Sequence, residues 1–224
     1  MKHKPLIIFG TGQVSEILSF YLKKLGREIF AYCVDEKYYK KTSFKNKKII
    51  TTKELYKRFK PKDVNLHIAI SYKKLNHLRE KKFLEFKKKG YFLESFVSNK
   101  NLYNSNFKIG ENCLILDSHI QPYSKISDNV YIWSGSIIGH HSVIKKHVWI
   151  SSGTALGGNS KIYDKCFLGM NTTVGHFVKI QKNCFISAGS TVTKNVQKNS
   201  VVFQAESKKL DYSARDFMEI IDIK

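Results

Sequence analysis

The sequence lacks any apolar run long enough to cross a lipid bilayer, which takes about 18–20 consecutive apolar residues. Its first residues, MKHKPLIIFGTG, hold a short apolar run with no cleavage-like segment before the glycines. We interpret this run as a first β-strand and not as a signal peptide. We therefore expect no stable membrane insertion and a cytoplasmic location.

Cysteine is scarce, and none of the four cysteines belongs to a CxxC pair. Spacings of that kind are typical of zinc sites and redox motifs. In a chain without a secretory signal, isolated cysteines are expected to be reduced and structural, not part of a disulfide framework. The four are Cys33, Cys113, Cys166 and Cys184.

Arginine is rare among the basic residues. Only 4 of the 39 basic residues are Arg, and with 18 acidic residues the formal net charge is +21. Proteins that read nucleic-acid bases rely on bidentate arginine contacts, so a nucleic-acid partner is not expected. The charge is concentrated in residues 1–100, which carry 25 Lys and Arg against 9 Asp and Glu. Such a field attracts anionic, phosphate-bearing substrates.

A repeat of six residues covers most of the second half of the chain. From Leu114 to Val192 every sixth residue is aliphatic, over fourteen consecutive positions, and the residue four places after each is small. Neither a helix period nor a strand period generates this pattern over such a length. It predicts a parallel β-helix of triangular cross-section, with three hexads in each 18-residue coil. The segment KIGENC (108–113) fits one residue out of phase and predicts an imperfect first coil.

A coil of 18 residues also predicts which side chains stack on neighbouring coils, about 4.8 Å apart. One outward column contains Tyr131, Trp149, Phe167 and Phe185. Long exposed apolar stripes usually mark an interface, although a loop or the tail could also cover this one. We therefore expect a cyclic homotrimer that buries the aromatic column.

The first hundred residues alternate between strand and helix patterns, which predicts a small α/β domain of Rossmann-like type. Gly10, Thr11 and Gly12 follow the first strand and precede a helix, where backbone N–H groups favour phosphate. A dinucleotide fingerprint needs a third glycine where Ser15 stands. A mononucleotide is the better fit, although tight turns also use glycines for structural reasons alone.

Two adjacent histidines, His140 and His141, fall at a predicted corner of the β-helix. In the 18-residue register Gly158 lies one coil after His140 and has no side chain to block its backbone N–H. A general base beside an open N–H is what acyl transfer requires, because the base takes a proton and the N–H stabilises an oxyanion. The alternative is that both histidines are polar corner residues.

A metal site is a second alternative. His140 and His176 share one column, and their separation is similar to that of two zinc ligands in γ-class carbonic anhydrases. That family supplies a third histidine five residues further on, where this chain has Gln181, a poor zinc ligand. We therefore expect no metal.

An α/β domain followed by hexapeptide repeats with SGSIIGHHSVI, FLGMNTTV and ISAGSTVTKNV resembles the bacterial nucleotide-sugar N-acetyltransferases and related sialic-acid O-acetyltransferases. The resemblance covers nearly the whole chain. It implies a left-handed β-helix, a nucleotide-sugar held by the N-terminal domain, and acetyl-CoA along the β-helix at a subunit boundary. It also implies that His140 is the base, that His141 replaces the usual Glu, Asp or Asn that orients it, and that Gly158 holds the oxyanion.

The resemblance places further residues in the two binding sites. The nucleotide pocket is expected to be lined by Gly10, Thr11, Gly12, Asp35 and Ser71, and the acetyl-CoA site by Gly158, Asn159, Gly175 and His176. Trp133 and Trp149 stand where the family frequently has Asn and His. A substrate contact is therefore either lost or replaced by stacking, and both tryptophans are candidate substrate contacts.

These patterns predict a nucleotide-sugar-binding α/β domain (1–97), a left-handed β-helix acyltransferase domain (98–200) and a short C-terminal helical tail (201–224). The predicted activity is acetyl transfer from acetyl-CoA to an amino group of a nucleotide-linked 3- or 4-amino-6-deoxyhexose, in bacterial surface-glycan biosynthesis. Two alternatives stay open. One is O-acetylation of a sugar hydroxyl, and the other is a non-catalytic trimeric scaffold that binds a nucleotide-sugar.

Overall fold

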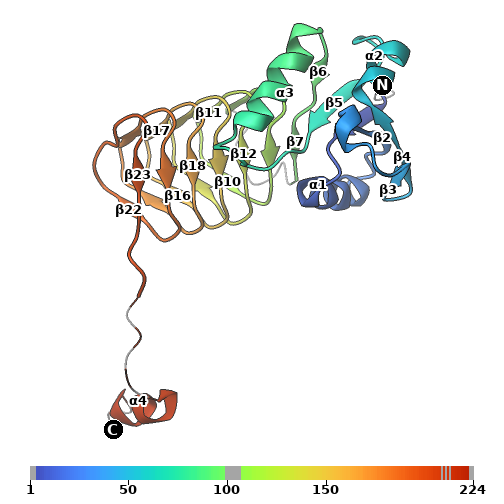
Figure 1. Cartoon of the computed structure of the whole chain (residues 1–224). Helices are drawn as coiled ribbons and strands as arrows, with labels where there is room; N and C mark the ends of the chain where they lie inside the picture. The colour runs from blue at the N-terminus through green and yellow to red at the C-terminus, as the bar shows by residue number, and fades with distance from the viewer. Residues whose placement is uncertain (1–3, 99–106, 208, 210, 212, 222–224) are drawn as a thin grey trace.

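Two bodies make up the computed structural model, which describes residues 4–98, 107–207, 209, 211 and 213–221. The N-terminal body is a sheet with helices, and the second body is a parallel β-helix that extends away from it (Figure 1). After the β-helix an extended segment leads to the helix α4 (Ala214–Ile221), which lies apart from both bodies. In the described residues no helix is long and apolar enough to cross a membrane.

The N-terminal sheet is mixed. Its six strands run in the order β3-β4-β2-β1-β5-β6, and all pairs are parallel except β3 with β4. The α/β prediction is confirmed in this coarser sense. The strands are β1 (Leu6–Phe9), β2 (Ile29–Val34), β3 (Ser43–Phe44), β4 (Lys47–Thr51), β5 (Asn65–Ile68) and β6 (Phe92–Leu93).

The helices of this body are α1 (Gln13–Lys24), α2 (Thr52–Arg58) and α3 (His77–Lys88), with a short 3-10 helix η1 (Glu36–Tyr38). The sequence pattern did not predict α2. Its signal was present, because Thr51 and Glu54 form a reciprocal capping box in which each side chain accepts a hydrogen bond from the other's backbone N–H. α3 begins after Asn76, a buried residue in the left-handed region with φ of 63°.

The β-helix has three walls, each a parallel sheet of two-residue strands. The aromatic wall consists of β7 (Phe96–Val97), β9 (Leu114–Ile115), β12 (Tyr131–Ile132), β15 (Trp149–Ile150), β18 (Phe167–Leu168), β21 (Phe185–Ile186) and β23 (Val201–Val202). The uncharged wall consists of β10 (His119–Ile120), β13 (Ile137–Ile138), β16 (Ala155–Leu156), β19 (Thr173–Val174) and β22 (Thr191–Val192). The lysine wall consists of β8 (Lys108–Ile109), β11 (Lys125–Ile126), β14 (Val143–Ile144), β17 (Lys161–Ile162) and β20 (Lys179–Ile180).

The register confirms the 18-residue coil and corrects its start. Ile132 pairs with Ile150 one coil later, and Ile109 pairs with Ile126, so KIGENC is the out-of-phase first coil. Leu114 was predicted as the first interior position, and this was wrong. Ile115 takes that place and pairs with Ile132, because the hexad between β9 and β10 is one residue short. Leu114 instead packs outward against the core of the N-terminal body.

The interior of the β-helix is a stack of aliphatic side chains with small residues at the corners. Cys166 and Cys184 lie in this interior as free thiols, as predicted. Each corner includes one residue in the left-handed region, which costs a residue with a Cβ about 1–2 kcal/mol. At one corner the left-handed residues are Tyr123, His141, Asn159 and Phe177.

The aromatic wall is covered by the N-terminal body of the same chain. Tyr131 is fully buried, and Trp149 and Phe167 are also buried, in one cluster with Leu18 and Leu22 of α1. The prediction that another copy of the chain buries this column was therefore wrong, and the column gives no support to a homotrimer. An outward column in a β-helix looks the same in sequence whether its own chain or another copy covers it.

His67 lies at the junction between the two bodies. Its Nδ1 is 2.8 Å from the carbonyl oxygen of Glu94, and its Nε2 is 3.0 Å from the hydroxyl of Tyr131. Burial lowers the pKa of His67 to about 4, from an ordinary value of 6.5. The neutral ring is therefore the form that the folded chain prefers.

We expect the free energy of unfolding to decrease as the pH falls from about 6.5 to about 4, because the unfolded chain then binds a proton that folded His67 does not. His67→Gln keeps polar contacts without this titration, and should remove about 3 kcal/mol of the decrease over that window. Urea unfolding at a series of pH values measures both slopes. Equal slopes for the variant and the wild type would contradict the assignment.

Candidate active site

A cavity of about 840 Å³ lies at the carboxyl ends of β1, β2 and β5. Loops at this edge of a parallel sheet are where open α/β folds bind ligands. All five residues predicted for the nucleotide pocket line this cavity, together with the lysines of its rim. They are Gly10, Thr11, Gly12, Asp35 and Ser71, with Lys37, Lys40, Lys73, Lys81 and Lys82.

Of the two glycines in the first turn, only Gly10 stands where a residue with a side chain would be strained. Gly10 has φ of 114°, and a Cβ on it would lie 2.8 Å from the carbonyl oxygen of Ala69. Gly12 has no atom within 4 Å of such a Cβ. Ser15, which replaces the third glycine of the dinucleotide pattern, is buried and donates a hydrogen bond of 2.8 Å to the carbonyl of Gly10.

Asp35 is held in place at the floor of this pocket. Lys82 Nζ lies 2.6 Å from Asp35 Oδ1 and 2.8 Å from Glu85 Oε2. Burial alone would lower the pKa of Lys82, but hydrogen bonds to the two carboxylates raise it above its ordinary value. Lys82 is therefore a stable cation. In the described residues the hydrogen bonds to Asp35, from Lys82 Nζ and Thr52 Oγ1, all go to Oδ1 and none goes to Oδ2.

A second cavity of about 360 Å³ runs across four coils of the β-helix at the corner between the uncharged and lysine walls. His140, Gly158, Gly175 and His176 line it, so the structure brings together most of the predicted catalytic and cofactor residues. Asn159 does not line it. Its backbone N–H donates a hydrogen bond of 2.8 Å to the carbonyl of His140, which ties adjacent coils together.

The imidazole of His140 lies directly against Gly158. A Cβ on Gly158 would be 2.6 Å from both Cε1 and Nε2 of His140, so any side chain there would displace the ring. In the described part of the chain no protein group accepts the backbone N–H of Gly158. The corresponding N–H of His140 is occupied, since it donates to Gln121 Oε1 at 2.9 Å.

The rings of His140 and His141 contact each other. The two Nδ1 atoms are 3.1 Å apart, which requires one ring to donate and the other to accept. When His140 donates its Nδ1–H, its Nε2 carries the lone pair that a general base needs. His141 has φ of 58°, and its ring centroid lies 4.7 Å from that of Tyr123 on the preceding coil. The sequence-based prediction missed Tyr123 and Gln121, although both fall in the predicted columns.

The structure does not bring Trp133 and Trp149 to either cavity. Trp149 is buried in the aromatic wall, where its Nε1 donates a hydrogen bond of 3.2 Å to Ser151 Oγ. The Trp133 ring packs beside it with centroids 5.3 Å apart. The packing between the two bodies accounts for Trp149, whereas the buried Nε1–H of Trp133 has no hydrogen-bond partner in the described residues.

The described residues contain no group of three or more His, Cys, Asp or Glu side chains arranged to hold a metal ion. The column of His140 and His176 does not add a third ligand at Gln181.

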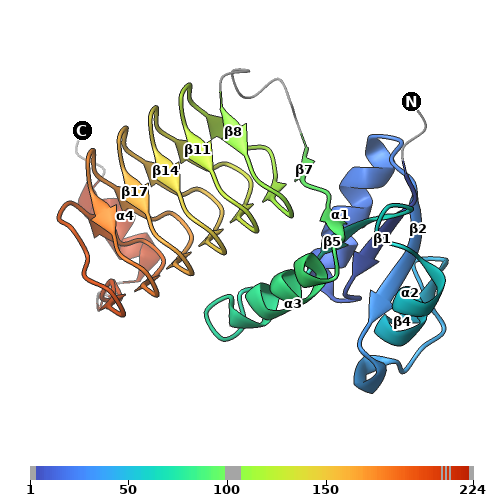
Figure 2. The same ribbon diagram turned by 90° about the horizontal axis from the view of Figure 1, so that it is seen from above.

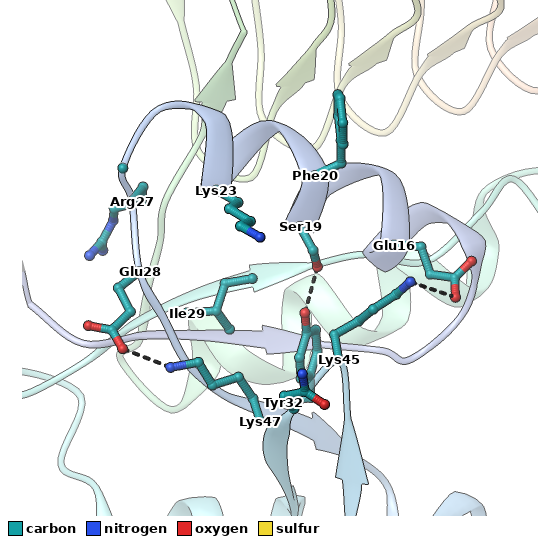
Figure 3. Close-up of a pocket in the computed structure, with 12 residues that line it drawn as sticks. Glu16, Ser19, Phe20, Lys23, Arg27, Glu28, Ile29, Tyr32, Lys45 and Lys47 are labelled. Atoms are coloured by element: carbon teal, nitrogen blue, oxygen red, sulfur yellow. Dashed lines mark hydrogen bonds and ion pairs between the residues drawn. The ribbon is translucent and has the colours of Figure 1, made fainter.

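A third cavity of about 590 Å³ lies beside α1 and the β3–β4 hairpin (Figure 3). Lys45 pairs with Glu16 at 3.5 Å and Lys47 with Glu28 at 2.7 Å, so its carboxylates are already neutralised (Figure 3). None of the predicted site residues lines this cavity. It shares no lining residue with the nucleotide pocket or with the cavity beside His140.

The cavity at the carboxyl ends of β1, β2 and β5, where the nucleotide was predicted to bind, also shares no lining residue with the His140 cavity. Their separation follows from the topology. The N-terminal body covers the aromatic wall, whereas His140 stands at the corner between the other two walls. In one chain the thickness of the β-helix therefore lies between the covered wall and the His140 corner.

Residues 159–194 match the family model described as bacterial transferase hexapeptide (six repeats). The chain therefore carries the repeat of the hexapeptide transferases in this segment. No curated protein matches the sequence.

The whole chain is similar to solved acetyltransferase structures. The acetyltransferase domain of PglB from Neisseria gonorrhoeae FA1090, in complex with acetyl coenzyme A, is 16% identical with a TM-score of 0.79, over 89% of this chain and 96% of that one. PerB from Caulobacter crescentus, in complex with CoA and GDP-perosamine, is 19% identical with a TM-score of 0.77, over 88% and 92%. WeeI from Acinetobacter baumannii AYE is 17% identical with a TM-score of 0.55, over 89% and 96%. The resemblance predicted from the sequence is thus confirmed at the level of the fold.

The two glycines of the first turn provide a matched pair of variants. Gly10→Ala should lower the free energy of unfolding by about 1–3 kcal/mol, because it forces a left-handed alanine against a carbonyl oxygen. Gly12→Ala should lower it by less, about 0.5–1 kcal/mol, because the space is open and only the preference for glycine over alanine at the N-cap of α1 is lost. Urea unfolding of the two variants and the wild type measures the difference. A Gly10→Ala protein as stable as Gly12→Ala would contradict the close approach at Ala69.

Proposed function

We propose that this chain is an acetyl-CoA-dependent N-acetyltransferase that acts on a nucleotide-linked 3- or 4-amino-6-deoxyhexose. The observation that carries the proposal is the imidazole of His140 placed against Gly158, whose backbone N–H has no protein acceptor in the described residues. The lysine-rimmed pocket of the N-terminal body supports the nucleotide part of the substrate. The fold shared with PglB and PerB structures that hold acetyl-CoA or CoA supports the donor.

The chemistry follows from these two groups. The sugar amine attacks the thioester carbonyl of acetyl-CoA, and His140 Nε2 accepts the proton that the amine loses. The carbonyl oxygen becomes an oxyanion, which the Gly158 N–H stabilises. Collapse of this intermediate breaks the carbon–sulfur bond, and the departing CoA thiolate takes the proton from His140. The acetyl group is then an amide on the sugar.

His141 acts on the tautomer of His140 in this mechanism. By accepting the Nδ1–H of His140, it keeps the lone pair at Nε2, on the side of Gly158. A neutral imidazole supports the base less than a carboxylate would, because it adds no charge to stabilise the imidazolium. The Tyr123 ring, tilted against that of His141, limits its rotation.

Nucleotide binding would use the turn at Gly10–Gly12 and the lysines of the rim. Backbone N–H groups at the start of α1 and the cations around the pocket suit a pyrophosphate. The free Oδ2 of Asp35 suits a hydroxyl or N–H donor of the nucleoside. Asn159, Gly175 and His176 would lie beside acetyl-CoA along the β-helix, which makes them candidate cofactor residues.

We further propose a homotrimer whose copies meet at the uncharged wall and not at the aromatic wall. The outward residues of the uncharged wall include no Lys, Arg, Asp or Glu, in a chain of net charge +21. They are His119, Ile137, Ala155, Thr173 and Thr191, followed by Gln121, Gly139, Gly157, Gly175 and Thr193. A second copy against this wall would bring its own nucleotide pocket to the His140 cavity. The compartment proposed for this assembly is the cytoplasm.

The central experiment measures thiol release from acetyl-CoA with a panel of UDP-, dTDP- and GDP-linked 3- and 4-amino sugars. We expect release to depend on one amino sugar, and to fall about 10²–10⁴-fold in kcat/KM for His140→Ala, because the base is lost. His77→Ala changes an exposed histidine on α3 and is the matched control.

The outcomes separate the alternatives. Release with a hydroxy sugar in place of the amino sugar would assign O-acetylation. Nucleotide binding without CoA binding in calorimetry would leave only a binding scaffold. A His140→Ala enzyme with full kcat/KM would exclude the mechanism whatever the substrate.

Co-expression of two inactive variants tests whether the site is built from two copies. Ser71→Trp fills the nucleotide pocket and His140→Ala removes the base, so each pure protein should be inactive. If one copy supplies the pocket and its neighbour the histidine, random mixed trimers should recover about a quarter of the wild-type rate. Mixed trimers without any recovery would show that each chain holds a complete site.

A further inference from the structure

Helix α3 lies between the N-terminal sheet and the coils of the β-helix (Figure 2). One of its faces lines the nucleotide pocket with Leu78, Lys81, Lys82 and Glu85. Its other face contacts the β-helix. Asn76 Nδ2 donates a hydrogen bond of 3.1 Å to the carbonyl of Cys166, and the ring of Phe83 lies 5.5 Å from that of His147. The position of this pocket wall therefore depends on contacts made at the back of α3.

Arg79 is at the centre of the face that contacts the β-helix, and it is fully buried. Its guanidinium reaches carbonyl oxygens of both bodies. Nη1 lies 3.5 Å from the carbonyl oxygen of Ile70, and Nη2 lies 3.3–3.5 Å from three carbonyl oxygens of the β-helix. Those three belong to Asn129, His147 and Val148.

Two aromatic rings of the covered wall contact the same cation. The guanidinium carbon is 4.4 Å from the ring centroid of Tyr131 and 5.4 Å from that of Trp149. Rings at these distances attract a desolvated cation. Burial lowers the pKa of Arg79 to about 10, which still leaves it protonated near neutrality.

This arrangement is costly in comparison with an apolar side chain. None of the hydrogen-bond partners of Arg79 in the described part of the chain is a carboxylate, and its Nε–H has no partner there. A buried unsatisfied donor typically costs about 1–3 kcal/mol, and apolar residues often replace buried ions without loss of stability. A role in stability alone therefore does not explain an arginine at this position.

The contact to Ile70 indicates what the arginine does. Ile70 and Ser71 follow β5 and line the nucleotide pocket, as does the opposite face of α3. The guanidinium of Arg79 thus ties two sides of that pocket, the Ile70–Ser71 segment and α3, to the same corner of the β-helix. We infer that Arg79 is a positioning residue for the nucleotide site: it fixes the Ile70–Ser71 segment and α3 in the arrangement that binds the nucleotide. The inference rests on the proposed function, since it takes the pocket to be a nucleotide site.

Calorimetric titration of the full-length protein with GDP, UDP, dTDP and CoA tests this role. For Arg79→Met we expect the Kd of the preferred nucleotide to rise about tenfold or more, because the pocket must be reordered on binding. The Kd of CoA should stay within about twofold, since Arg79 contacts the carbonyls of Asn129, His147 and Val148, and none of these residues lines the cavity beside His140. Arg79→Lys keeps the charge without the planar fork, and should have an intermediate nucleotide Kd.

Lys165→Met is the matched control. Lys165 also ties α3 to the β-helix, through an ion pair of 3.4 Å with Glu80, but it is partly exposed and far less constrained. Its loss should change nucleotide affinity by less than about twofold. If Arg79→Met does not fold, as loss of the wild-type circular-dichroism spectrum would show, the Arg79→Lys variant decides.

Three results would overturn the inference. The first is unchanged nucleotide affinity in Arg79→Met, or in Arg79→Lys where that variant decides. The second is an equal loss of affinity for nucleotide and CoA, which would indicate a purely structural residue. The third is wild-type protein that binds CoA but none of the nucleotides. Only this last result also removes the nucleotide part of the proposed function, so the two failures are distinguishable.

Discussion

The burial of the aromatic wall by the N-terminal body is the constraint on which the rest of the molecule depends. Tyr131, Trp149 and Phe167 are removed from water by α1, α3 and the segments around them. At about 25 cal/mol per Å² of apolar surface, large aromatic side chains are among the strongest contributors to such an interface. Since this wall is covered, only the uncharged and lysine walls remain for a ligand or another copy, and His140 stands at the corner between them.

Much of the β-helix could be predicted because its interior is read directly from a period of six. The aliphatic residues from Ile120 to Val192 occupy the interior places that the sequence predicts. The start was wrong by one residue, since Leu114 and Ile115 are both aliphatic and only the strand pairing shows which faces inward. The juxtaposition of His140 and Gly158 could be predicted for the same reason, because residues 18 apart lie on adjacent coils.

The features that could not be predicted from the sequence are those that depend on contacts between the two bodies. The outward side chains of a wall have the same period whether they meet solvent, another copy or their own N-terminal body. The family resemblance therefore made Trp149 a candidate substrate contact, and the sequence pattern did not distinguish Arg79 within a lysine-rich helix. The contact between Tyr123 and His141 falls between these cases. Residues 18 apart can be recognised as neighbours from the sequence, but the direction of the rings follows from the left-handed geometry of the corner.

The distribution of charge over the two remaining walls indicates which wall another copy could cover and where an anionic acetyl donor would bind. The lysine wall presents Lys108, Lys125, Lys161 and Lys179 in one column, with Val143 between them. Like charges this close are tolerated only where water and salt screen them, so covering this wall with an apolar surface would be unfavourable. The uncharged wall has no such cost and can be buried by another copy. The cavity beside His140 would then have a copy of the chain on one side and a positive field on the other, and this combination suits a donor with several phosphates.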